Sequence, residues 1–173
     1  MADGFVLCLI FTGFFFLALY ANPWLGFDNY PPDIKARVHD VPHVPLSLRL
    51  GIALPFLTLI FAIILRSTTR LVRSGSTRSG LLPATLHTFL LLQIVNAWDV
   101  VVIDWLIFVT IQPDSVILPG TIGAAGYGDY AFHFRQSYMT LTPWAGTFAV
   151  ALFVGALASW MARRWPPRRQ ALG

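Results

Sequence analysis

The sequence predicts an all-α integral membrane protein, built as a four-transmembrane-helix bundle with two extracytoplasmic loops capping one end. Of its 173 residues, 56% are hydrophobic and only 12% are charged, and the mean hydropathy is +0.66. Such values are typical of membrane proteins. Four apolar runs approach the roughly 20 residues that a helix needs to cross a bilayer. We therefore expect a single membrane domain over residues 1–173.

The predicted spans cover residues 5–21, 48–65, 82–111 and 141–162. A signal peptide is the alternative for the first run. However, the segment before it has no basic residue and contains Asp3, and Leu19-Tyr20-Ala21 fits a cleavage site poorly. We therefore interpret it as a helix. The third run is too long for an upright span, so it tilts, projects beyond the bilayer or breaks into two helices.

The basic residues predict the orientation of the spans. Eight arginines lie in the loop 66–80 and the tail 163–173, whereas the loops 22–47 and 113–140, with the edges of the spans beside them, hold four basic residues. The positive-inside rule then places both termini and loop 66–80 in the cytoplasm. We expect a bacterial plasma membrane. The net charge is +4, and we attribute it to the arginines that orient the spans. The expected partner is therefore the lipid bilayer and not nucleic acid.

The third run carries the most informative residues. An aspartate inside a spanning helix costs roughly 2.5 to 3.5 kcal/mol on insertion scales and usually persists because it has a function. If the run is α-helical, its polar side chains share an arc of about 140°. At about 1.5 Å per residue, Asp99 lies about 25 Å and Asp104 about 33 Å from Leu82, toward the outer face. These polar residues are Gln93, Asn96, Asp99 and Asp104.

A structural role is the alternative for both aspartates. They would then cap loops or pair with Arg49 or Arg135, because polar contacts also hold membrane helices together. The sequence leaves this choice open.

The loop 113–140, which the orientation places on the outer side, supplies further candidates for ligand binding. We interpret its glycines as turn residues; the alternative is that their backbone N–H groups bind an anion. An arginine in the same loop is suited to bind a phosphate or a carboxylate. Aromatic residues are interpreted mainly as packing or interfacial residues. The candidates for lining an outward-facing pocket are the four polar residues of the third run, Trp98 beside them, and Tyr127, Asp129, His133 and Arg135 of the loop.

No metal site is expected, and no cofactor is indicated. His39, Asp40 and His43 are close in sequence, but Pro42 disrupts helical spacing between the histidines, and the H-E-x-x-H motif is absent. Cys8 is the only cysteine, which excludes an intramolecular disulfide and thiol oxidoreductase chemistry of the two-cysteine type.

The fourth span carries small residues at every fourth position. Such a stripe lets helices approach closely, so it predicts a packing seam inside the bundle or with another protomer of a homo-oligomer or a membrane partner. Its members are Thr147, Ala151, Gly155 and Ser159.

Three functions remain open at this stage. The first is a protein that binds or translocates a proton, a cation or a polar head group at the carboxylates. The second is a small membrane enzyme in which Asp99 or Asp104 is a general acid or base on a lipid or isoprenoid-like substrate, with His133 or Arg135 orienting the head. The third is a structural or assembly subunit of a membrane complex.

Overall fold

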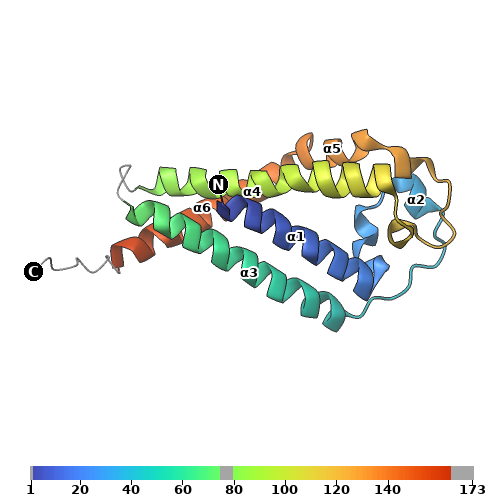
Figure 1. Ribbon diagram of the computed structural model, residues 1–173, viewed down its shortest axis with the longest axis horizontal. Coiled ribbons are helices and arrows are strands. Elements are labelled where there is room, and N and C mark those ends of the chain that lie inside the picture. The colour runs from blue at the N-terminus through green and yellow to red at the C-terminus, as the bar shows by residue number, and fades with distance from the viewer. Residues whose placement is uncertain (1, 75–79, 165–173) are drawn as a thin grey trace, which may run out of the picture.

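The computed structural model describes residues 2–74 and 80–164, and this part of the chain is helical without any strand. Its long helices are α1 (Ala2–Ala21), α3 (Leu46–Arg73), α4 (Leu81–Trp98) with its continuation η2 (Asp99–Ile111), and α6 (Leu141–Arg164) (Figure 1). Each is long and apolar enough to cross a membrane, with α4 and η2 forming one 31-residue candidate span. The prediction of four long apolar helices is confirmed, and their composition indicates a membrane location. Loop residues 75–79 and tail residues 165–173 lie outside the described part.

Short elements connect the long helices at the end where α1 and η2 finish. The segment after α1 forms η1 (Pro23–Asn29) and α2 (Pro32–Ala36). The segment after η2 forms η3 (Asp114–Val116), η4 (Ala125–Gly128) and α5 (Tyr130–Tyr138). Figure 1 shows α2 beyond the end of the long helices, and α5 alongside the third span. We call this the loop end of the molecule.

The helix α3 is longer than the apolar run that predicts it. It continues past Leu65 to Arg73, because hydroxyl groups just beyond the run are buried against α4. Thr68 hydrogen-bonds to Thr88 through the two hydroxyls at 2.9 Å, and Ser67 hydrogen-bonds to His87 at 3.1 Å. Hydrogen bonds of this kind join helices in an apolar environment.

A small apolar core joins all four long helices. It consists of Leu7 from α1, Ile64 from α3, Leu91 from α4 and Val154 from α6. The first helix begins beside the middle of α4, since a side chain added at Gly4 would contact Leu91 and Ile94 (Figure 1). Consequently, the far end of α1 is level with η2 and the loop end.

Helix α6 approaches α4 closely at Gly155. A Cβ atom added at Gly155 would lie 2.8 Å from the backbone nitrogen of Thr85. Ala151 and Ser159, one turn to either side of Gly155, are also buried. Three residues of the small-residue stripe predicted on the fourth span are thus covered by packing within the chain.

The α4–α6 contact predicts a specific sensitivity to a single methyl group. Gly155→Ala is expected to lower the free energy of unfolding by about 1 to 3 kcal/mol, because the added Cβ overlaps the backbone of α4. Gly146→Ala, in the same helix, is the matched control, since its Cβ would meet nothing within 4 Å. Thermal unfolding in detergent measures both, and equal melting temperatures for the two variants would contradict this packing.

Candidate functional site

The third span changes its winding at Asp99. The α-helical segment α4 ends at Trp98, and the backbone continues as a π-helix to Ile111. The π-helix ends with a hydrogen bond from the Gln112 N–H to the Ile107 carbonyl at 2.9 Å, five residues back. Gln112 itself is left-handed, with φ 49°. Wide helical turns of this kind are rare and often accompany functional sites.

The π winding brings together side chains that an α-helix would separate. In an α-helix, Asp104 would lie roughly 140° and Phe108 roughly 180° around the axis from Asp99. A π-helix bonds each residue to the fifth one along, so residues five apart stack about one turn above each other. Asp99, Ile103, Asp104 and Phe108 accordingly line one cavity.

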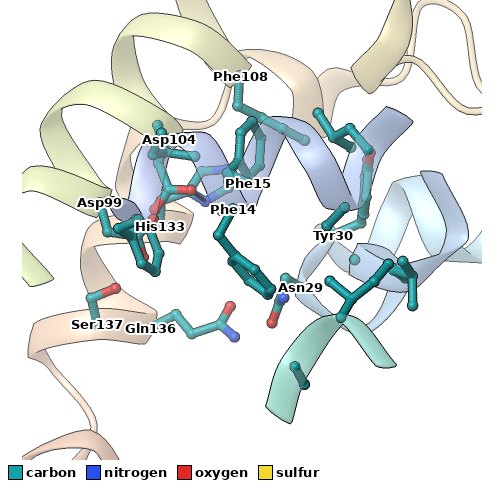
Figure 2. Close-up of a pocket in the computed structure, with 18 of the residues that line it drawn as sticks. Phe14, Phe15, Asn29, Tyr30, Asp99, Asp104, Phe108, His133, Gln136 and Ser137 are labelled. Carbon is teal, nitrogen blue, oxygen red and sulfur yellow. Dashed lines mark ion pairs between the residues drawn. The ribbon is translucent and has the colours of Figure 1, made fainter. Parts of the chain in front are cut away.

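This cavity, which we call the carboxylate cavity, has a volume of about 520 Å³ and lies between α1, η1, the start of α3, η2 and α5 (Figure 2). Much of its wall is aromatic and aliphatic. The aromatic lining residues are Phe11, Phe14, Phe15, Tyr30 and Phe108.

Polar groups concentrate at one end of the carboxylate cavity. Figure 2 shows Asp99, Asp104 and His133 together there, with Gln136 and Ser137 of α5 beside them. Asn29 of η1 and Arg49 of α3 also line the cavity. The cavity therefore combines an apolar body with a polar head region.

Asp104 and His133 form a direct pair across two elements. The distance from Asp104 Oδ1 to His133 Nδ1 is 3.1 Å, and the side chain of His133 is only 7% exposed. The other ring nitrogen, Nε2, is buried and has no hydrogen-bond partner among the described residues. The imidazole packs edge to face against Phe108, with ring centroids 5.0 Å apart.

Asp99 has no such partner. Its side chain is partly buried, and among the described residues its carboxylate makes no hydrogen bond or ion pair. In the described part of the chain, neither of the arginines weighed in the sequence as partners forms an ion pair with Asp99 or Asp104. Arg135 pairs with Asp129 at 3.4 Å, and Arg49 lines the cavity without an ion pair to either aspartate in the described chain.

The amides of the third span lie below the cavity and do not line it. The Asn96 amide contacts the Gln93 side chain at 3.5 Å and also hydrogen-bonds to Tyr138. Burial raises the pKa of the Tyr138 phenol, and the hydrogen bond from Asn96 acts in the opposite direction. These contacts connect the third span to the end of α5.

Four other predicted site residues are placed in structural contacts outside the cavity. The Trp98 indole donates a hydrogen bond to Thr12 of α1 at 2.9 Å. The Tyr127 hydroxyl accepts a hydrogen bond from the Leu118 N–H at 2.9 Å. Asp129 caps the start of α5 by accepting a hydrogen bond from the Phe132 N–H at 2.9 Å, and its pair with Arg135 is on the exposed side of α5.

The loop end has a core of its own that supports the cavity. Phe108 and Tyr127 pack there with Tyr30, whose hydroxyl donates to the Val116 carbonyl at 2.9 Å. Burial raises the pKa of the Tyr30 phenol, so it remains a neutral hydrogen-bond donor. One face of this aromatic cluster thus forms part of the cavity wall.

Some lining residues were missed by reading the sequence. Gln136 and Ser137 follow His133 by three and four residues, the spacing of one helical face, so the start of a helix at Asp129 would have indicated them. Phe14 and Phe15 lie in an apolar run and give no comparable signal. The described residues contain no cluster of three or more His, Cys, Asp or Glu side chains suited to a metal ion.

No family model, characterised protein or solved structure matches this chain at a significant level. The functional interpretation therefore depends on the geometry of the carboxylate cavity.

The cap on α5 is predicted to control the order of the helix that carries His133. Asp129→Ala is expected to cost about 1 kcal/mol, because the Phe132 N–H loses its acceptor. Hydrogen exchange of residues 130–138 should accelerate. Asp28→Ala is the control, because Asp28 accepts a hydrogen bond from Lys35 through its backbone carbonyl, which the substitution keeps. Unchanged exchange in α5 of the Asp129 variant would argue against this role.

Proposed function

We propose that this chain is a multi-pass membrane protein that binds an amphipathic molecule with a cationic head in the carboxylate cavity. In this proposal the four long helices form one bundle, and the loop end caps it on the outer side. Asp99 and Asp104 receive the head, and the aromatic wall receives the apolar body. The observation that carries the proposal is that Asp99, without a protein partner in the described chain, lies at the polar end of an otherwise largely apolar cavity.

The charge distribution supports an outward-facing cavity. Arg66, Arg70 and Arg73 lie in the last turns of α3, and Arg163 and Arg164 end α6. Both helix ends lie far from α2 and the loop end (Figure 1). Under the positive-inside rule the arginine-rich end is cytoplasmic, so the carboxylate cavity opens toward the other side.

The charges in the cavity support a cationic head. The titratable side chains that line the cavity include two carboxylates, one imidazole and one arginine, Arg49, which is exposed at the start of α3. Asp104 has His133 as a partner, whereas Asp99 has none in the described residues. A carboxylate in apolar surroundings carries a large desolvation penalty unless it is paired, and a bound cation would supply the pair.

The body of the cavity supports an apolar chain on that cation. Phe14 stacks on Phe56 of α3, with ring centroids 3.8 Å apart. Phe15 packs against the loop-end core. This wall offers an apolar surface next to the carboxylates, and ligand pockets commonly combine such a surface with a few polar groups that fix the orientation.

A pair of probes with the same chain length tests the proposal. Decylammonium and decanol differ in charge, so their affinities for the detergent-solubilised protein separate the contribution of the head from that of the chain. Asp99→Asn is expected to weaken binding of decylammonium at least about tenfold, because a charge-assisted hydrogen bond contributes roughly 1.5 to 3 kcal/mol. Binding of decanol should change little.

Asp28→Asn is the matched control, because Asp28 is an exposed carboxylate of η1 that does not line the cavity. It should bind both probes like the wild type. Unchanged decylammonium affinity in the Asp99 variant would contradict the proposal and favour a structural or assembly role. An equal loss in the Asp28 variant would point to nonspecific attraction by surface charge.

A second candidate function is a membrane enzyme that acts on a lipid or isoprenoid-like molecule. The observation that favours it is the Asp104–His133 pair, because an imidazole oriented by a carboxylate can act as a general base. Mass spectrometry of the molecules recovered from the protein distinguishes the two functions. Recovery of chemically altered molecules supports the enzyme, and recovery of unchanged ligand supports a binding protein.

A further inference from the structure

Three of the residues that line the carboxylate cavity are exposed, and they mark its mouth. The exposed lining residues in the described chain are Asn29 of η1, Arg49 near the start of α3 and Gln136 of α5. The other lining residues are buried or partly buried, Asp99 and Asp104 among them. The two carboxylates are therefore more enclosed than the groups at the mouth.

Every side chain at the mouth carries N–H donors, and none carries a negative charge. Each amide offers an NH₂ group, and the guanidinium offers five donors and a positive charge. Among the described residues, none of the three side chains has a hydrogen bond or an ion pair. Figure 2 shows the amides of Asn29 and Gln136 turned toward the same space. Such a set of free donors is suited to an anionic group, because hydrogen bonds to a charged acceptor are the strong ones.

The cavity thus offers opposite charges at two levels. Asp99 lies in its enclosed part and Arg49 at its mouth, on the separate elements η2 and α3. The two do not pair with each other in the described chain. A ligand with a cation alone would leave the donors at the mouth to water, whereas a ligand that also carries an anion would bind both levels.

We propose that the carboxylate cavity binds a zwitterionic amphiphile, in which the ammonium that carries the apolar chain is followed by an anionic group such as a carboxylate. The chain lies against the aromatic wall, and the ammonium is bound by Asp99. The anionic group accepts hydrogen bonds from the three side chains at the mouth. This inference rests on the proposed function, because it names the ligand class for the same cavity. The order of chain, cation and anion follows the order of apolar wall, enclosed carboxylates and exposed donors.

A matched pair of amphiphiles tests this ligand class. N-decyl-β-alanine has an ammonium followed by a carboxylate. Its amide, N-decyl-β-alaninamide, has the same chain, the same ammonium and nearly the same size, but no negative charge. In the wild type we expect the zwitterion to bind at least about fivefold tighter, a modest preference because the donors at the mouth are exposed to solvent. Isothermal titration calorimetry of the protein in detergent measures both affinities.

Arg49→Gln isolates the charge at the mouth. The variant loses the positive charge and keeps an amide donor, so the preference for the zwitterion should fall below about twofold. Its affinity for the uncharged amide of the pair should stay within about twofold of the wild type, because that probe has no anion for Arg49 to bind. Arg66→Gln is the matched control, because Arg66 is an exposed arginine of the same helix that does not line the cavity. It should keep the wild-type preference.

The outcomes separate this inference from the proposed function. If the wild type binds both probes equally and Asp99→Asn weakens both, the cavity binds cations but the zwitterionic class is wrong. A preference that persists in Arg49→Gln would overturn the role of the mouth. If the wild type binds neither probe, the proposed function fails and the inference fails with it. β-Alanine without a chain should bind far more weakly, and equal affinity for it would overturn the amphipathic ligand.

Discussion

A helix inside a bilayer must satisfy its backbone hydrogen bonds internally, and the third span does so with two different windings. Up to Trp98 it is an α-helix, and from Asp99 to Ile111 it is a π-helix. Either winding satisfies the backbone, but each presents a different set of side chains to the same neighbour. The change at Asp99 therefore determines which residues of the span line the carboxylate cavity. The π-helix is followed by Gln112, whose backbone is in the left-handed region and whose side chain donates a hydrogen bond to the Tyr127 carbonyl at 3.0 Å.

The carboxylate cavity depends on contacts from both sides of this winding change. Below it, the Trp98–Thr12 hydrogen bond joins α1 to the end of α4. Above it, the Trp105 indole donates to the Tyr130 carbonyl at 3.0 Å, which joins η2 to α5 and brings His133 toward Asp104. The polar groups in the cavity are thus held by packing and by hydrogen bonds from several elements. Such support keeps a site in a single geometry before a ligand binds.

The long helices could be predicted from the sequence because a helix needs a hydrophobic run of about 20 residues to cross a bilayer. It also singled out Asp99, Asp104 and His133 on chemical grounds, and the fold brings these three into one cavity. It could not indicate the winding of η2, because the apolar residues around Asp104 are compatible with either helix. Nor could it place Tyr127 and Asp129, whose contacts depend on how the segment between η2 and α6 folds. Loop packing of this kind follows from long-range contacts that have no periodic signature.

The most direct test of this account is to determine which residues of η2 face α5. The photoreactive residue benzoylphenylalanine can replace Phe108 or Leu106, and the cross-linked peptides can be identified by mass spectrometry. With π winding, residue 108 lies against His133 and Tyr127, whereas Leu106 is exposed. We therefore expect cross-links from position 108 to residues 127–138 and none from position 106. With α winding, position 106 would lie roughly 20° around the axis from Asp99 and position 108 on the opposite side. Cross-links to α5 from position 106 and not from 108 would contradict the account.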